Sequence, residues 1–376
     1  MSNLLEKASI ILTPTAYNTS EVLCVKPSDG SGDFDFSRAT DATRINSLGL
    51  IETIGINLPR INYEAGCGSW LFEPQTTQLL TYSEDFSQWI AGGSTTIQSG
   101  YLAPDGTNSA YKVSGSGSAL SLAASLLATT TRSIYARTVS GTGQANLCSY
   151  NSNTNNLFTI TEEWQRFDVN SANATGVTTF YAVDFRGGTT LSEIILWGAN
   201  ATNDQDYATS YVPSNGASVT RNQDLCTNGG SLATINSTEG TLYAEIARDN
   251  NDGASGGIQI NSGSVDNSLR LFFNQDDTVS VITRVGGSNN VVKTARSITS
   301  STAMNKFALV WKLNDYKFYY NGTELWSDTS ASVYPVGTLN NLEFKNQNVP
   351  FNGKTKCLAV WKEALTDSEL TALTTI

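Results

Sequence analysis

Short runs in which every second residue is apolar are the feature that most constrains the fold of this chain. Residues 306–313 carry Phe, Leu, Trp and Leu at alternate positions, and residues 241–248 and 268–274 repeat the pattern. A period of two is typical of β-strands with one buried face. Asn321-Gly322 stands between two further strand-like runs, and this dipeptide is the strongest short-range hairpin signal. The pattern predicts an all-β protein.

The composition agrees with many strands joined by turns. The chain has 34 Asn and 31 Gly, and charged residues make up 15%, against about 25% in ordinary soluble domains. Hydrophobic residues still reach 39%, which is enough to build packed cores. The sequence 366–369, Thr-Asp-Ser-Glu, predicts a capping box that begins one short helix near the end.

A length of 376 residues allows two domains. We therefore predict two tandem β-sandwiches of the jelly-roll type after a small N-terminal attachment region. The expected parts are an attachment segment at 1–33, an arginine-rich region at 34–80 that packs on the first sandwich, and sandwiches at 81–224 and 225–376.

Charge and the absence of histidine exclude several functions. Lys and Arg total 23, Asp and Glu total 34, and the net charge of −11 makes nucleic acid an unsuitable main partner. With no histidine, Ser-His-Asp and Cys-His catalysis and His-ligated zinc are excluded. Glycoside hydrolysis needs two carboxylates that flank one bond, and Glu245, Glu324 and Glu343 each lack a suitably spaced partner. We expect a protein that is not an enzyme.

Arginines among apolar residues predict a structural clasp in the first part of the chain. A guanidinium between apolar side chains must be hydrogen-bonded to carboxylates or carbonyls. A ligand site is the alternative. The predicted clasp comprises Arg38, Arg44, Arg60, Glu73, Arg221 and Asp224.

Aromatic and polar residues around the predicted hairpin suggest a glycan site. Sugar recognition combines an aromatic ring that stacks on the pyranose with amides and carboxylates for its hydroxyls. The alternative is that these aromatic residues belong to the core. The predicted site comprises Tyr319, Asn321, Trp326, Asp328 and Tyr334.

Calcium is the one cofactor that the sequence leaves open. Residues 249–253 supply hard oxygen ligands, with Asp249 and Asp252 as the candidates. The twelfth-position Glu of an EF-hand is missing, and the same residues are ordinary turn formers.

The N-terminal apolar tip Ile10, Ile11 and Leu12 is too short to form a core of its own. It predicts either a docking segment or a frayed terminus. Three copies of the chain could bury the tip together. Because we see no signal peptide and no stretch long enough to cross a bilayer, we expect synthesis in a cytoplasm and no membrane insertion. The five scattered cysteines are expected to be buried reduced thiols.

Three groups of motifs resemble tailed-bacteriophage virion proteins that carry a carbohydrate-binding-module-like jelly roll. The first group is 36–52, 59–63 and 71–80, the second is Trp164-Gln165 and Trp197-Gly198, and the third is 209–213 with 219–224. The family commonly has Gln-Leu-Glu after Trp-Gly-Ala, whereas this chain has Asn-Ala-Thr at 200–202. Any role of that acidic residue is therefore missing here.

The last third resembles the laminin G-like or concanavalin A-like jelly roll, in residues 307–311, 320–322 and 359–365. Together the resemblances imply a structural virion protein, a head or tail fibre or a capsid decoration protein, displayed on the virion surface. The implied partners are capsid or tail proteins, two further copies of the chain in a homotrimer, and host-surface glycans during attachment. A glycan depolymerase and a bacterial surface adhesin are the alternatives.

Overall fold

The computed structural model describes residues 2–127, 129–149, 156–170, 179–250 and 256–376. Strands hold 49% of the chain and helices 4%, which confirms the all-β prediction of tandem β-sandwiches. Within the described residues, no helix is both long and apolar enough to cross a bilayer.

The chain forms two compact units, each described here by itself. The terminal unit contains both ends of the chain and comprises residues 1–39, 56–74 and 223–376. The central unit comprises residues 40–55 and 75–222. The chain therefore passes between the units several times, which a linear series of domains does not predict.

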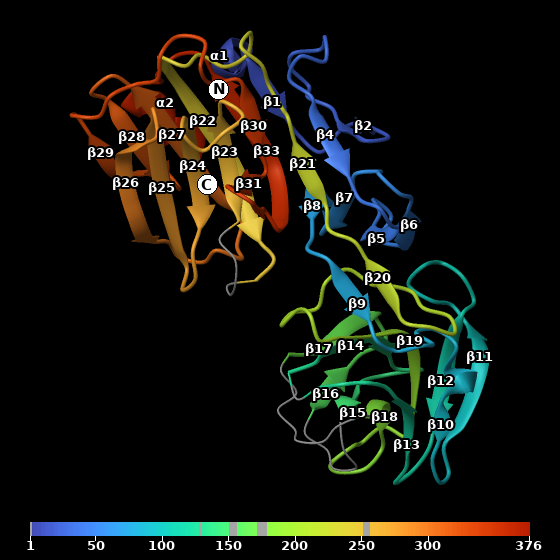
Figure 1. Ribbon diagram of the computed structural model, residues 1–376. Helices are drawn as coiled ribbons and strands as arrows, with labels where there is room; N and C mark the ends of the chain where they lie inside the picture. The colour runs from blue at the N-terminus through green and yellow to red at the C-terminus, as the bar shows by residue number, and fades with distance from the viewer. Residues whose placement is uncertain (1, 128, 150–155, 171–178, 251–255) are drawn as a thin grey trace. The chain divides into compact units, whose positions relative to one another are not determined.

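The terminal unit is a sandwich of two antiparallel sheets (Figure 1). The larger has the order β29 (Thr323–Asp328), β28 (Tyr316–Tyr320), β27 (Asn305–Lys312), β22 (Glu239–Arg248), β33 (Gly353–Trp361), β8 (Cys67–Phe72) and β7 (Ile61–Glu64), and β1 (Ile10–Leu12) also pairs with β33. The smaller has the order β26 (Ser288–Ser297), β25 (Thr278–Val285), β24 (Ser268–Phe273), β23 (Gly257–Asn261) and β30 (Asn341–Glu343). Leu242, Leu309, Ile260 and Leu271 from both sheets meet in one core.

Two short helices cover the outer face of the larger sheet. Helices α1 (Ser2–Lys7) and α2 (Asp367–Thr374) contribute Leu4 and Leu370 to a second apolar cluster with Tyr243 and Trp361. The predicted capping box of α2 is confirmed, since Thr366 and Glu369 cap each other's backbone N–H groups. Strands β22, β27 and β33 are therefore buried on both faces rather than on one.

The N-terminal tip is part of this sheet and not a free docking segment. Strand β1 pairs with β33, with Ile10 opposite Val360 and Leu12 opposite Leu358 (Figure 1). Ile10 and Leu12 are fully buried, and Ile11 is partly buried. The prediction that Ile10, Ile11 and Leu12 form a docking segment is therefore corrected, because the chain's own C-terminal strand already pairs with these residues.

The arginine-rich region is divided between the two units. The prediction that 34–80 packs on the first sandwich is corrected, because β7 and β8 extend the larger sheet of the terminal unit. Burial of large aromatic rings explains this placement. Phe72 is 1% exposed, and its ring centroid lies 4.9 Å from that of Phe344. A small sheet of β2 (Tyr17–Asn18), β3 (Glu21–Val22), β4 (Phe34–Ser37) and β21 (Leu225–Thr227) completes this part, with the hairpin β31 (Lys345–Asn346) and β32 (Val349–Pro350).

The central unit is a second sandwich of two five-stranded sheets. One has the order β10 (Ile90–Ala91), β13 (Ala119–Ala123), β18 (Thr179–Asp184), β15 (Gly143–Ser149) and β16 (Leu157–Ile160). The other has the order β11 (Thr96–Tyr101), β12 (Ala110–Ser114), β19 (Glu193–Thr202), β14 (Thr131–Arg137) and β17 (Gln165–Val169). The pairs β5 (Ala42–Ile45) with β6 (Ile51–Ile54), and β9 (Thr76–Gln78) with β20 (Val219–Arg221), belong to the same unit.

The core of the central unit lies between its two sheets. Leu120 and Phe180 from one sheet meet Ile134 and Leu196 from the other, and all four are fully buried. On the other side of β19, Trp197 packs on Tyr211 with ring centroids 4.6 Å apart. This packing fixes the segment that follows Tyr211, which forms one wall of the site described below.

The cysteines differ in exposure and none forms a disulfide. Cys24, Cys148 and Cys226 are buried thiols, as expected, whereas Cys357 is partly exposed and Cys67 is exposed. Burial raises the pKa of the Cys24 thiol to about 12, so this group is not a reactive thiolate at neutral pH.

Candidate functional site

Four of the six predicted clasp residues meet in a buried ion-pair network of the terminal unit. Arg38 Nη1 lies 3.0 Å from Asp224 Oδ1, and Arg60 bridges Asp224 at 2.5 Å and Glu73 at 2.7 Å. The Glu73 backbone N–H donates to Asp224 Oδ2 at 2.8 Å. Burial alone would lower the pKa of Arg60, but Asp224 and Glu73 raise it above its usual value. The network joins β4, β8 and the chain before β21.

Arg44 and Arg221 lie in the central unit and take other partners. Arg44 stands directly opposite Glu52 in the β5–β6 hairpin, and their side chains pair at 2.6 Å. Arg221 is buried and donates from Nη1 to Ser210 Oγ at 2.8 Å. The predicted single clasp is thus corrected to separate sets, because strand register gives Arg44 a partner of its own.

The three aromatic residues of the predicted glycan site do not form a stacking platform. Tyr319 and Trp326 are 4% and 8% exposed and belong to apolar clusters on opposite faces of the larger sheet. Trp326 stacks on Phe318 with centroids 5.8 Å apart. Tyr334 is 1% exposed and donates its hydroxyl to Ser268 O at 2.8 Å. That prediction is wrong, because these rings fill the core.

The two polar members of the same prediction stabilise turns. Asn321 has a φ of 44° in the confirmed Asn-Gly hairpin, and its Oδ1 accepts from Lys306 N at 2.9 Å. Asp328 accepts from Ser330 N at 3.1 Å and pairs with Lys293 at 3.3 Å. The hydrogen bond from the Ser330 backbone, with help from Lys293, lowers the pKa of Asp328.

The calcium prediction falls at the edge of the described chain. Asp252 lies outside the described residues, and Asp249 follows β22. Across the described ranges, no three His, Cys, Asp or Glu side chains are grouped so that they could hold a metal ion. A second acidic turn, Gln-Asp-Asp at 275–277, serves the fold, since Asp277 accepts from Ser301 N at 2.6 Å.

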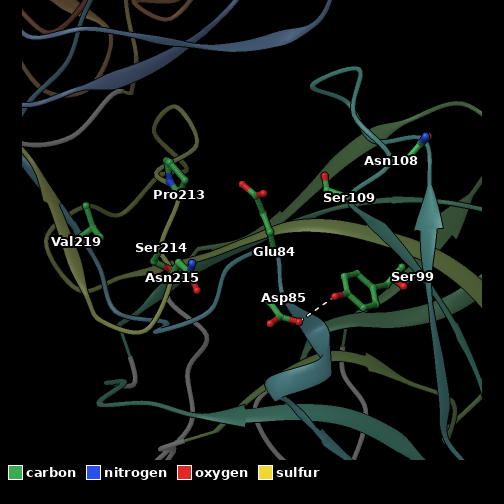
Figure 2. Close-up of a pocket in the computed structure, with 10 residues that line it drawn as sticks. Glu84, Asp85, Ser99, Asn108, Ser109, Pro213, Ser214, Asn215 and Val219 are labelled. Carbon is green, nitrogen blue, oxygen red and sulfur yellow. Dashed lines mark hydrogen bonds between the residues drawn. The ribbon is translucent and has the colours of Figure 1, made fainter.

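A pocket of about 460 Å³ in the central unit gathers polar side chains from distant parts of the sequence. Figure 2 shows Ser99, Asn108 and Ser109 on one side, Pro213, Ser214, Asn215 and Val219 on the other, and the two carboxylates between them. We call it the Glu84–Asp85 pocket. Its lining residues are Glu84, Asp85, Ser99, Asn108, Ser109, Tyr111, Pro213, Ser214, Asn215 and Val219.

Backbone and hydroxyl contacts hold the wall at 213–216 in place. Ser214 N donates to Ser83 Oγ at 2.8 Å, and Ser214 Oγ donates to Leu80 O at 2.7 Å. Gly216 N donates to Thr81 O at 2.6 Å. The segment that carries the carboxylates therefore also fixes the opposite wall, so the pocket is preorganised.

Asp85 is oriented by the first turn of a short 3₁₀ helix, η1 (Phe86–Gln88), for which it is the N-cap. Its Oδ1 accepts from Ser87 Oγ at 2.5 Å, from Ser87 N at 3.1 Å, and from Tyr111 Oη at 2.9 Å (Figure 2). The Ser87 hydroxyl, followed by Tyr111 and the Ser87 backbone, lowers the pKa of Asp85 below its usual value. Asp85 is therefore an ionised acceptor at neutral pH.

The neighbouring Glu84 is shifted in the opposite direction. Burial raises the pKa of Glu84, and nearby Asp105 adds to the effect, while a hydrogen bond from Tyr211 opposes it. That bond runs from the Tyr211 hydroxyl to Glu84 Oε1 at 2.8 Å, and Ser83 Oγ lies 2.7 Å from the same hydroxyl. Burial also raises the pKa of Tyr211, so Tyr211 stays protonated.

The sequence gives only a weak signal for this pocket. Nothing in the sequence distinguishes Glu84-Asp85 from other acidic pairs or places it beside Tyr111 or Asn215. Pro213 does lie in the 209–213 motif, which could have directed attention to this wall.

Comparison with known families matches residues 217–371 to the Concanavalin A-like lectin/glucanases superfamily. The match supports the expected laminin G-like or concanavalin A-like jelly roll in the last part of the chain. It covers less than half of the 376 residues. Comparison with curated proteins found no match.

Several solved structures are similar to parts of the chain. One is a Ruminococcus gnavus IT-sialidase CBM40 bound to alpha2,3 sialyllactose, with 20% identity and a TM-score of 0.32, covering 37% of this chain and 83% of its own. Another is domain 4 of AbnA, a GH43 extracellular arabinanase from Geobacillus stearothermophilus, in complex with arabinotriose, with 16% identity and a TM-score of 0.34, covering 46% and 84%. A heptameric SAP-like pentraxin from Limulus polyphemus has 15% identity and a TM-score of 0.32, covering 39% and 72%.

Proposed function

We propose that the chain is a carbohydrate-binding protein whose central unit takes a glycan in the Glu84–Asp85 pocket. The observation that carries this proposal is the pocket's lining, which combines two carboxylates with serine hydroxyls, two amides and a tyrosine. A sugar presents many hydroxyls that donate and accept at once, so it is suited to such a lining. A volume of about 460 Å³ also lies within the range of small-ligand sites.

The lining side chains offer different hydrogen-bonding groups to a sugar. Asp85, kept ionised, accepts hydrogen bonds from ligand hydroxyls, and charged acceptors make the stronger bonds. Asn108 and Asn215, both exposed at the rim, can donate and accept toward the same ring. None of the ten described lining residues is basic, so the pocket favours neutral sugars over acidic ones.

Titration calorimetry of the full chain against neutral oligosaccharides tests this function. We expect Asp85→Asn to weaken binding at least about 10-fold, because loss of a charged hydrogen bond is worth about 1.5–3 kcal/mol. Glu163→Gln, an exposed carboxylate of the same unit, is the matched control and should bind like the wild type. Equal affinity of all three proteins would refute the assignment of the pocket.

The biological setting that we propose is the surface of a tailed-bacteriophage particle. The resemblance of 36–52, 71–80 and 209–224 to virion proteins supports a head or tail fibre or a decoration protein that adheres to host-surface glycans. The proposal includes a homotrimer attached to capsid or tail proteins. Because Ile10 and Leu12 are buried within the chain, other residues form the contacts between its copies. Mass spectrometry of separated phage heads and tails tests it.

Glycan hydrolysis is the second candidate, and the opposite pKa shifts of Glu84 and Asp85 favour it. Two carboxyl groups that differ in protonation at one pH can act as acid and base. Release of reducing ends from host polysaccharide, lost in Glu84→Gln, would identify a depolymerase. Binding without release would identify an adhesion protein.

A further inference from the structure

The smaller sheet of the terminal unit carries a polar face whose composition is set by strand register. Gln259 on β23 pairs with Arg270 on β24, and Arg270 pairs with Ile282 on β25. In the next row Ser268 pairs with Arg284. Arg270 and Arg284 therefore lie on the same face of neighbouring strands and are diagonal neighbours. The opposite face of the sheet packs into the core with Leu269 and Leu271.

Glu343, a carboxylate of this face, already has its partners. Glu343 on β30 accepts from Gln259 Nε2 and Asn261 Nδ2, both at 2.7 Å, and pairs with Lys345 at 2.7 Å. Burial alone would raise the pKa of Glu343, but Lys345, Gln259 and Asn261 together hold it below its usual value. The charge of Glu343 is therefore neutralised by Lys345.

Arg270 has no such compensation. It is 4% exposed, yet its contact within the described residues is a 3.3 Å hydrogen bond from Nη1 to Asn346 Oδ1, and its buried Nε has no acceptor there. No carboxylate of the described chain pairs with it. Burial and the nearby Arg284 lower the pKa of Arg270. A buried charge without a partner is costly, so an anion bound at Arg270 would offset that cost.

Arg284 extends the same site toward solvent. It is only partly buried, donates from Nη2 to Gly287 O, and has a buried Nε without an acceptor in the described part of the chain. Arg284 lies close enough to lower the pKa of Arg270, so the two positive charges repel each other and an anion bound by both would relieve the repulsion. Arginine presents paired N–H donors that match the geometry of carboxylate and sulfate groups.

We infer that Arg270 and Arg284 form a binding site for an oxyanion, a carboxylate or sulfate group, on the polar face of the smaller sheet. This site is independent of the Glu84–Asp85 pocket, which has two carboxylates and no basic lining residue. The group could belong to an acidic glycan or to a free inorganic anion, since both offer the same oxygens to the arginines.

Titration calorimetry of the full chain with sodium sulfate, sodium glucuronate and glucose at constant ionic strength tests the site. We expect sulfate or glucuronate to bind with an affinity that depends on both arginines, whereas any heat from glucose should be the same in the wild type and in the arginine variants. Binding should fall at least about 10-fold in Arg284→Gln and disappear in Arg270→Met, since each substitution removes charged hydrogen bonds to the anion. Arg296→Gln removes an exposed arginine of β26 in the same sheet and should leave the affinity unchanged.

Thermal unfolding gives a second measurement. Its result would be different if Arg270 only stabilised the fold and bound no anion. At ten times the dissociation constant, the anion should raise the melting temperature of the wild type by about 4 °C. Without anion, Arg270→Met should melt at or above the wild-type temperature, because an unpaired buried charge has been removed. A lower melting temperature of Arg270→Met, with no difference in anion affinity between wild type and Arg284→Gln, would overturn the proposal.

The two anions distinguish the sources of the ligand. Stronger binding of glucuronate than of sulfate supports an acidic sugar, and the reverse supports a free inorganic anion. Failure of both anions to bind overturns the site without affecting the proposed neutral-glycan pocket, whose test uses other ligands and variants of the other unit.

Discussion

Two carboxylate pairs in this protein show how environment separates a structural group from a binding group. Asp224 and Glu73 of the terminal unit are fully buried and are bound by Arg38 and Arg60. Glu84 and Asp85 of the central unit are partly buried, and their hydrogen bonds come from neutral hydroxyl and amide groups. The same chemical group thus serves the fold in one unit and lines a pocket in the other.

The difference lies in how many lone pairs of each carboxylate already accept hydrogen bonds from the protein. Asp224 accepts from two arginines and from the Glu73 backbone, so a ligand would have to displace the fold itself. Asp85 is held mainly through one oxygen, Oδ1, and its longest contact, 3.3 Å from Gln88 Nε2, is to Oδ2. We therefore expect substitutions to affect stability in the terminal unit and ligand binding in the central unit.

The largest expected effect is that of Asp224→Asn. Removing this charge leaves Arg38 and Arg60 buried with incomplete compensation, so we expect a loss of about 3–5 kcal/mol in the free energy of unfolding. Urea denaturation followed by tryptophan fluorescence measures it. Glu52→Gln breaks the partly exposed pair with Arg44 and should cost at most about 1 kcal/mol. Equal effects of the two substitutions would remove the distinction between buried and exposed pairs.

The N-terminal strand provides the next test. Leu12→Ala should destabilise the terminal unit by about 2–5 kcal/mol, because Leu12 is fully buried against β33. Ile11→Ala, at a partly buried position of the same strand, should cost less. Thermal denaturation compares the two. A stable protein after deletion of residues 1–12 would contradict the placement of β1 in the sheet.

A smaller effect distinguishes Tyr211 and Tyr111, the two tyrosines that donate hydrogen bonds to the pocket carboxylates. Tyr211→Phe should cost about 1–2 kcal/mol, since the buried hydroxyl bonds both Glu84 and Ser83. Tyr111→Phe removes a partly exposed hydroxyl from Asp85 and should cost about 0.5 kcal/mol. Denaturant unfolding measures both, and the reverse order would contradict the difference in burial between them.

The smallest effect is a pH dependence of opposite sign at the two pocket carboxylates. The raised pKa of Glu84 adds stability below the usual Glu value, and this is lost as pH rises through the raised pKa. The lowered pKa of Asp85 adds stability above the usual Asp value, which is lost as pH falls through the lowered pKa.

Melting temperatures between about pH 3 and pH 7 measure this dependence. The stability of the wild type relative to Glu84→Gln should decrease as pH rises, and relative to Asp85→Asn it should decrease as pH falls. Parallel curves for the two variants would show that both carboxylates are in the same environment.

Local sequence patterns predicted individual strands, turns and helices better than they predicted which of these elements pack together. Alternation identified β22, β24 and β27, Asn321-Gly322 identified a hairpin, and the residues from Thr366 onward identified α2. Each of these signals depends on neighbours within a few residues. The aromatic cluster failed for the same reason, because adjacency in sequence put Tyr319 beside Trp326 although the sheet separates them.

The all-β class, the strand periods, the polar turns and the need to pair buried arginines all follow from short stretches of the sequence. Three other features are visible only in the folded chain: Ile10 joins β33, Asp224 meets Arg38 and Arg60, and residues 84, 111 and 215 line one pocket. The reason is that a strand's periodicity records which of its faces is buried, whereas the element that buries it lies up to 350 residues away, as Ile10 does from Val360. Long-range pairing follows from the packing of the whole core, and no local pattern contains it.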